Sequence, residues 1–163
     1  MEKQPLLNTY INNVTMSETV EAIEQMITAD KKSYIVAINV DVVMKIEDDP
    51  YLKKVVDRAD MVLVDGKPLV WISKMHGKPL KAKISGSDLV PLLCEAAAEK
   101  GYKIEVFLFN TKGELSPDCQ TNKELVEMME EVKFHEISTQ FVPPVLTPDH
   151  LVIDGLFGSG LNK

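Results

Sequence analysis

The sequence predicts an α/β protein with a Rossmann-like, mainly parallel sheet flanked by helices. Short runs of consecutive Val, Ile and Leu residues, typical of strands covered on both faces, alternate with segments of helical period. Such alternation favours parallel strands joined by crossover helices. The chain has 163 residues, of which 45% are apolar, and this is enough for one hydrophobic core.

Four strands and five helices are expected along the chain. The strands lie at residues 33–39, 60–65, 103–109 and 150–154. The helix starts carry capping signals: Thr15 with Glu18, Asp49 before Pro50, Pro68, Ser87, and Thr121 with Glu124. Gly101 closes the helix that Ser87 begins, and the prolines within residues 141–149 predict an extended loop.

Charge and cysteine content exclude several classes of protein. Lys and Arg number 18 against 25 Asp and Glu, and the net charge of −7 argues against a nucleic-acid partner. Two cysteines, Cys94 and Cys119, are too few for a disulfide scaffold and fit a reducing compartment. The N-terminus lacks the apolar core of a signal peptide, and no apolar run approaches the roughly 20 residues of a membrane span. We therefore expect a cytoplasmic protein.

A carboxylate ends the second predicted strand, in the stretch VLVDGKPLVW. Asp65 stands directly before the Gly66 turn and the helix that Pro68 opens. In open α/β sheets, ligands bind outside the carboxyl ends of the strands, where a carboxylate can act as a general base. Position alone leaves two interpretations of Asp65, a base or a helix-capping turn residue.

Polar residues also end the first predicted strand. Asn39 and Asp41 would lie at the same sheet edge as Asp65 if the two strands are parallel. A side-chain amide there suits recognition of sugar hydroxyls or of a base. Capping of the following helix is the alternative.

The turn SGSD is a candidate phosphate site. Gly86 lets a ligand approach the backbone, and the free N–H groups of a helix that starts near Ser87 and Asp88 favour an anion. Lys83, just upstream, either adds positive charge to this turn or lies solvated on the surface.

The ending HLVIDGLFGSGLNK repeats the pattern of a strand followed by glycines. Asp154 is placed like Asp65, and Gly158 with Gly160 forms a GxG turn of the kind found in phosphate loops. No helix follows to cover this strand, so we expect a C-terminus truncated within a βα unit and a chain that is oligomeric or locally loose. The three histidines show no metal-ligand spacing, so no metal is expected.

Residues 1–104 resemble the TagA/WecG/CpsF family of bacterial glycosyltransferases. The resemblance is carried by NVDVVMKIEDDPYLKKVVDRADMVLVDGKPLVW and by ISGSDLVPLLCEAAAEKGYKI. It implies inverting transfer of an N-acetylhexosamine, typically N-acetylmannosamine, from a UDP-sugar to a lipid-linked saccharide acceptor. It also implies a peripheral position at the inner membrane face and an active site without metal or cofactor.

The same resemblance assigns roles to individual residues. It implies that Asp65 is the catalytic base and that Asn39 lines the pocket. Substrate contacts are expected from Asn39, Asp41, Gly66, Lys83, Gly86, Ser87 and Asp88. Two positions depart from the family pattern, since Ala37 replaces a Thr and Lys83 replaces an Arg. Lysine cannot make the bidentate phosphate contact of an arginine.

From about residue 103 the chain resembles the epimerase domain of YjeF-type NAD(P)H-hydrate repair enzymes. VFLFNTKGELSPDCQTNKE and HLVIDGLFGSGLNK carry this match, which implies a potassium ion near Asp154 and an alternative site at Asp154, Gly158 and Gly160. The dinucleotide-diphosphate loop of that family is missing from the sequence. We therefore expect a mosaic of residues 1–104 and 105–163, packed into one α/β unit. Glycosyl transfer is the leading function, and an epimerase fragment or a catalytically silent scaffold is the alternative.

Overall fold

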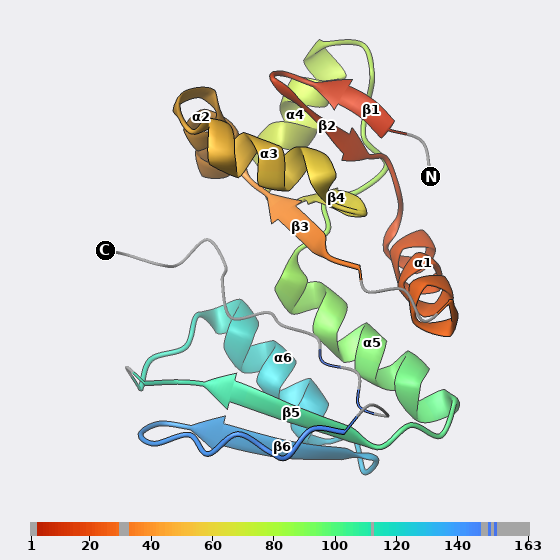
Figure 1. The fold of residues 1–163 in the computed structure, drawn as a ribbon, viewed down its shortest axis with the longest axis vertical. Coiled ribbons are helices and arrows are strands. Elements are labelled where there is room, and N and C mark those ends of the chain that lie inside the picture. The colour runs from red at the N-terminus through yellow and green to blue at the C-terminus, as the bar shows by residue number, and fades with distance from the viewer. Residues whose placement is uncertain (1–2, 30–32, 112, 148–149, 151, 153–163) are drawn as a thin grey trace. The chain divides into compact units, whose positions relative to one another are not determined.

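The structure is a computed structural model that describes residues 3–29, 33–111, 113–147, 150 and 152 (Figure 1). The chain divides into two compact units, Met1–Leu89 and Val90–Lys163. Strands and helices alternate through both units, and two of the three strand pairs within the described residues are parallel. The expected α/β class is thus confirmed.

The first unit begins with a hairpin that the sequence analysis does not predict. Strands β1 (Lys3–Leu6) and β2 (Thr9–Asn12) pair antiparallel, with Leu6 opposite Thr9. The two-residue turn holds Leu7 at a φ of 52°. Glycine and asparagine are the usual residues at such a φ, and this hairpin turn therefore lacks its usual sequence signal.

Helix α1 (Met16–Thr28) starts as the sequence predicts. The Thr15 hydroxyl accepts a hydrogen bond from Glu18 N at 3.2 Å, and the Glu18 carboxylate accepts one from Thr15 N at 2.7 Å. This is the reciprocal capping box, which satisfies two backbone donors at the helix start. The helix buries Thr19, Ala22 and Ile23.

A βαβ crossover follows, from β3 (Ile35–Ile38) through α2 (Val40–Asp48) and α3 (Pro50–Arg58) to β4 (Met61–Val64). The two strands are parallel, with Ile38 opposite Val64. Asp49 both ends α2 and caps α3, where its carboxylate accepts hydrogen bonds from two backbone N–H groups at 2.9 and 3.0 Å. The predicted pairing of an Asp cap with Pro50 at the first helical position is confirmed.

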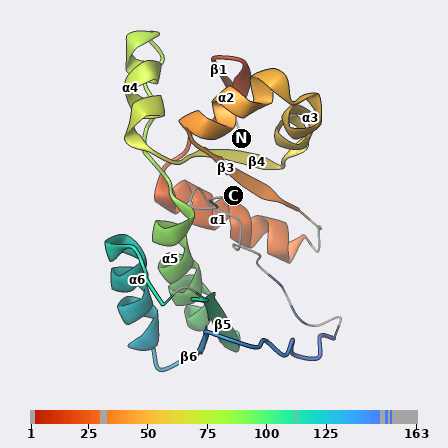
Figure 2. The same ribbon diagram turned by 90° about the vertical axis from the view of Figure 1, so that its left-hand side faces the viewer.

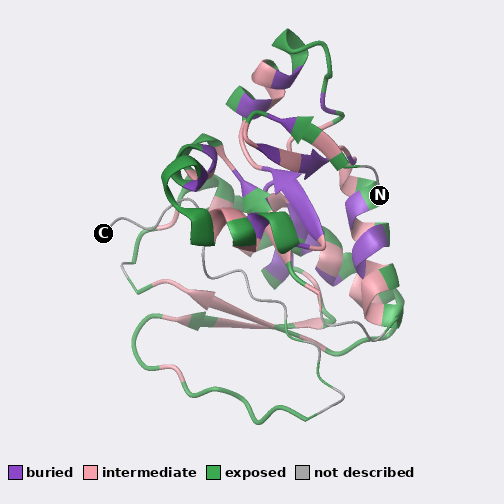
Figure 3. Ribbon diagram, turned by 45° about the horizontal axis from the view of Figure 1, so that its top comes forward, coloured by how far each residue is buried: buried purple, intermediate pink, exposed green. Residues whose placement is uncertain are grey.

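Strand β4 is the most buried element of the first unit, since all four of its residues are buried (Figure 3). One of its edges pairs with β3. On the other edge, Val62 N donates to the Asn12 side-chain oxygen at 2.8 Å, and Val64 O accepts from Ile84 N at 2.7 Å. A side chain and a loop residue therefore complete this edge, so that buried backbone groups of β4 keep partners.

Helix α4 (Lys67–Met75) follows β4 after a sharp turn. Its end carries a Schellman-type cap, in which Gly77 has a φ of 70° and Lys78 N donates to Ser73 O at 3.0 Å. The Ser73 side chain is fully buried and accepts a hydrogen bond from Leu80 N at 3.0 Å. The segment after α4 is thereby tied back onto the helix.

Helix α5 (Gly86–Glu99) starts two residues earlier than it would with Ser87 as its cap. Ser85 takes that position, since its hydroxyl accepts from Asp88 N at 3.4 Å and its carbonyl accepts from Leu89 N at 3.1 Å. The prediction that Ser87 caps this helix is therefore wrong by two residues, because the first of the two serines in SGSD is the one that precedes the helical turn. Gly101, with a φ of 75°, follows the helix end as expected.

The second unit contains β5 (Ile104–Phe109), α6 (Pro117–Glu127) and β6 (Val132–Ile137), and its two strands are parallel. The capping box at Thr121 is wrong, because α6 begins at Pro117 with Ser116 as its cap and Thr121 lies inside the helix. Strand β6 is not predicted from the sequence. Its half-buried residues include His135, whose ring stacks on Phe107 with centroids 4.7 Å apart.

The predicted strand at 150–154 falls mainly outside the described residues, and His150 and Val152 carry no regular structure. The interpretation of the C-terminus as truncated is therefore untested. Among the helices of the described residues, none has the length and apolar character needed to cross a bilayer.

Candidate functional site

The carboxyl ends of β3 and β4 bring Asn39 and Asp65 side by side. Ile38 pairs with Val64 in the parallel register, and the Asp65 backbone N–H donates to Ile38 O at 2.8 Å. Adjacent strands lie about 4.8 Å apart, so the residues that follow Ile38 and Val64 are direct neighbours across the pair. Asn39 and Asp65 thus lie at the same edge of the sheet, as the sequence predicts.

Asn39 caps helix α2, as the alternative interpretation predicts. Its Oδ1 accepts a hydrogen bond from Val42 N at 3.0 Å. Within the described part of the chain, no residue accepts a hydrogen bond from its Nδ2. Asn39 can therefore cap the helix through Oδ1 and still donate a hydrogen bond to a ligand through Nδ2.

The Asp65 carboxyl is only partly exposed, and its surroundings favour the protonated form. Loss of water contact raises the pKa of Asp65 above its ordinary value, the nearby Lys83 ammonium lowers this pKa, and the Asp88 carboxylate raises it. The net direction is upward. A carboxylate with a raised pKa is a better proton acceptor than an ordinary surface aspartate, which suits general-base chemistry.

Lys83 and Asp88 form an ion pair beside this carboxyl, with 3.1 Å between Nζ and Oδ2. The 81–85 segment is held against β4 by the bond from Ile84 N to Val64 O, which places Lys83 and Ser85 on either side of a fixed residue. Ser85 is buried, and its hydroxyl also lies 3.3 Å from that of Ser87. The sequence analysis includes Ser85 in the SGSD turn but assigns the cap of α5 to Ser87.

Gly66 is required by its backbone conformation. It has a φ of 109° and a ψ of 141°, a region that side chains rarely occupy, while a Cβ would meet only Pro68 Cδ at an ordinary 3.6 Å. Gly66 precedes α4, whose first turn has no side-chain cap. Pro68 has no N–H, so Lys67 and Leu69 supply the backbone N–H groups of this turn, and neither is bonded by a capping side chain.

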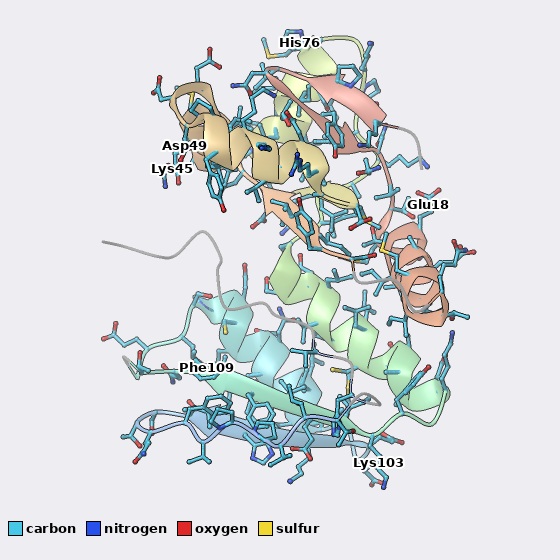
Figure 4. All side chains as sticks on the ribbon, viewed as in Figure 1. Glu18, Lys45, Asp49, His76, Lys103 and Phe109 are labelled. Atoms are coloured by element: carbon cyan, nitrogen blue, oxygen red, sulfur yellow. The ribbon has the colours of Figure 1, made fainter. Side chains whose placement is uncertain are left out.

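Gly86 occupies the first position of α5 and has open space around the place of a Cβ. Neither the conformation nor the packing of Gly86 requires a glycine. The lack of a side chain does leave room for a ligand to approach the backbone closely. Asp41 has a different partner, since its exposed carboxylate pairs with Lys45 of the same helix at 2.7 Å. Figure 4 labels Lys45 on α2.

Two cavities are lined by other residues. One of about 250 Å³ is lined by Pro5, Leu6, Leu7, Ser73, His76 and Lys78. The other, of about 430 Å³, belongs to the second unit and is lined by Ala98, Gly101, Tyr102, Lys103, Ile104, Glu105, Glu131 and Lys133. Neither is lined by a predicted site residue.

The remaining predictions concern metals and the second site. In the described ranges, no group of three or more His, Cys, Asp or Glu side chains is placed to hold a metal ion. Asp154, Gly158 and Gly160 lie outside the described residues, so the epimerase-like site and its potassium ion stay predictions.

Comparison with known proteins assigns the chain to a family. Residues 4–143 match the glycosyl transferase WecG/TagA/CpsF family, a range that runs past the junction expected near residue 104. Over 80 residues the chain is 35% identical to an N-acetylglucosaminyldiphosphoundecaprenol N-acetyl-beta-D-mannosaminyltransferase of Bacillus spizizenii. That alignment covers 49% of this chain and 30% of the length of the relative. The chain belongs to the WecG/TagA/CpsF family of glycosyl transferases.

Proposed function

We propose that the chain transfers an N-acetylhexosamine of the N-acetylmannosamine type from a UDP-sugar to a lipid-linked saccharide acceptor. Family membership supports glycosyl transfer, and the name of the Bacillus relative supports the sugar and the lipid-linked acceptor. The observation that carries the proposal to particular residues is the pairing of Asn39 and Asp65 at the carboxyl edge of β3 and β4.

Asp65 is the base of the proposed reaction. Its carboxylate takes the proton of the acceptor hydroxyl while the hydroxyl oxygen forms a bond to the anomeric carbon. The bond from that carbon to the donor diphosphate breaks, and the electron pair leaves with UDP. Attack opposite the leaving group inverts the anomeric centre. The raised pKa of Asp65 supports this role, because the carboxylate is then a stronger proton acceptor.

The groups around Asp65 suit the two ends of the donor. The Asn39 Nδ2 donates to a sugar oxygen, since its Oδ1 is already used by the cap of α2. The diphosphate is held by N–H groups of the first turns of α4 and α5, with Lys83 adding charge. Because Lys83 already pairs with Asp88, its contribution to phosphate binding is smaller than that of an unpaired cation.

The experiment compares wild type with Asp65→Asn in two assays. Transfer is measured with UDP-N-acetylmannosamine and a lipid-diphosphate N-acetylglucosamine acceptor, and UDP binding is measured by titration with thermal shift. Loss of a general base lowers the transfer rate by about 10²–10⁴-fold. Binding of UDP by the variant should stay close to wild type, because Asp65 acts on the acceptor and not on the diphosphate.

Asp48→Asn serves as the matched control, since Asp48 is an exposed aspartate at the end of α2. It should leave both transfer and UDP binding unchanged. Wild-type turnover in Asp65→Asn would remove Asp65 from the mechanism and leave it a turn residue. Absence of both transfer and UDP binding in the wild-type chain would refute the proposed function as a whole.

A further inference from the structure

Positive charge is concentrated in one short segment of an acidic chain. Residues 66–87 contain no Asp or Glu and hold five lysines: Lys67, Lys74, Lys78, Lys81 and Lys83. The segment carries a charge of +5 in a chain of net charge −7, so all other residues together carry −12. Such asymmetry marks a surface for an anionic partner.

Two of these lysines have internal partners and three do not. Lys81 pairs with Glu18 at 2.7 Å and Lys83 with Asp88 at 3.1 Å. Lys67, Lys74 and Lys78 are exposed and have no ion-pair partner in the described ranges of the chain. The three unpaired lysines all belong to α4 or to the turn that ends it.

The outer face of α4 also exposes two large apolar side chains. Trp71 is 61% exposed and Met75 is 86% exposed, while Leu69 and Ser73 on the opposite side are fully buried. With 3.6 residues per turn, Lys67, Trp71, Lys74 and Met75 fall within about 100° of the helix circumference. These four residues and Lys78, which lies in the turn after the helix, are called here the α4 face. His76 marks the end of α4 in Figure 4.

We infer that the α4 face docks on the surface of an anionic lipid bilayer. Trp71 and Met75 enter the headgroup region, and Lys67, Lys74 and Lys78 contact the phosphates of anionic lipids. Tryptophan favours the membrane interface, where its ring is buried and its N–H stays hydrated. Lysine reaches from an apolar surface to the charged headgroups through its flexible stem.

The composition of the α4 face separates a bilayer from a purely electrostatic partner. A surface built only for charge would not expose Trp71 and Met75 between its lysines, because isolated large apolar groups gain nothing from contact with a hydrated anion. A basic and aromatic helix face is instead typical of helices that lie in the membrane interface. Helix α4 also begins two residues after Asp65, so docking would hold the base close to the bilayer that carries a lipid-linked acceptor. In that last respect the inference rests on the proposed function.

Trp71 is the single tryptophan of the chain and therefore reports directly on this face. Its fluorescence is recorded while the full chain is titrated with vesicles of phosphatidylcholine, or of phosphatidylcholine and phosphatidylglycerol in equal parts. We expect a blue shift and protection from aqueous quenchers only with the anionic vesicles. Sedimentation with the same vesicles gives the partition coefficient.

The lysine variants give the size of the effect. Each lysine near an anionic surface contributes about fivefold to partitioning, which corresponds to about 1 kcal/mol. The triple variant Lys67→Gln, Lys74→Gln, Lys78→Gln should therefore bind anionic vesicles about 100-fold more weakly. The matched control Lys54→Gln, Lys103→Gln, Lys133→Gln removes the same charge from three exposed lysines elsewhere and should change binding less than about threefold.

Several results would overturn the inference. Equal binding to neutral and anionic vesicles, an unshifted Trp71 spectrum, or an equal loss in the control triple variant would each exclude docking through the α4 face. Competition by inorganic phosphate at low millimolar concentration would assign the lysines to a free anion. Shielding of Trp71 by self-association without vesicles would assign the face to a second copy of the chain. The proposed function is tested separately, because UDP binding and the comparison of wild type with Asp65→Asn require neither vesicles nor the lysine variants.

Discussion

The bond between the Asn12 side chain and Val62 N predicts how much one buried polar group contributes to the first unit. Asn12 is 5% exposed and Val62 is fully buried, and 2.8 Å separates the Asn12 Oδ1 from the Val62 N. Asn12→Ala removes the acceptor and leaves a backbone N–H of β4 without a partner. Water cannot replace the acceptor readily, because both residues lie inside the core.

The magnitude follows from the burial of both groups. Leaving a buried donor unsatisfied lowers the free energy of unfolding by about 1–3 kcal/mol. Values in the upper part of this range are expected where solvent is excluded. The free energy of unfolding of a domain is about 5–15 kcal/mol, so the variant loses a large share of it. We expect a loss of about 2–3 kcal/mol for Asn12→Ala.

Urea unfolding followed by Trp71 fluorescence measures this loss in the first unit alone, since the single tryptophan lies on α4. Asn13→Ala is the control. Asn13 also bonds through its side chain, accepting from Lys81 N at 2.8 Å and donating to Gln4 at 2.9 Å. The first of these bonds is exposed and the second is only partly buried, so water can substitute more readily than at Asn12. Its loss should be below about 1 kcal/mol. Equal losses in the two variants, or unchanged amide exchange at Val62, would refute the argument that burial sets the cost.

Three further predictions concern the hairpin, the Gly66 turn and the proposed base. Leu7→Asn should raise the free energy of unfolding by about 0.5–1 kcal/mol in the same urea assay, because asparagine tolerates positive φ better than leucine does. Gly66→Ala should lower it by about 1–3 kcal/mol through backbone strain, while Gly86→Ala, with ordinary φ and open space, should not. The acid limb of the pH profile of kcat/KM for transfer should follow the pKa of Asp65, since the base must be deprotonated. Lys83→Gln removes a group that lowers this pKa, so the acid limb should move to higher pH. An acid limb that stays in place in this variant would show that Asp65 is not the base.

Much of the first unit is predictable from its sequence because local signals and burial agree there. The run of four apolar residues in β4 is buried throughout, and Thr15 with Glu18 makes the capping box that its spelling indicates. The edge shared by Asn39 and Asp65 follows from one assumption, that the two strands are parallel. Where a strand is continuous and apolar, position on the sheet can be derived without a structure.

The elements that escape prediction have weak or misleading local signals. In the hairpin, Pro5 lies within a strand and the turn uses Leu7, so neither residue has the type expected at its position. Strand β6 carries Lys133, His135 and Glu136, which makes it too polar to stand out. The ion pair of Lys83 with Asp88 and the partial burial of Asp65 depend on contacts between separate elements, which no local pattern records.

The bond from Ile84 N to Val64 O has a consequence for how this site can change. It joins two peptide groups, so it survives any side-chain exchange at the neighbouring positions. The side chain at position 83 can therefore change without moving the loop, and an exchange of lysine for arginine would alter the phosphate contact proposed for Lys83. If the proposed donor site is correct, variation at position 83 changes donor affinity, while the backbone bond that holds the 81–85 segment against β4 stays the same.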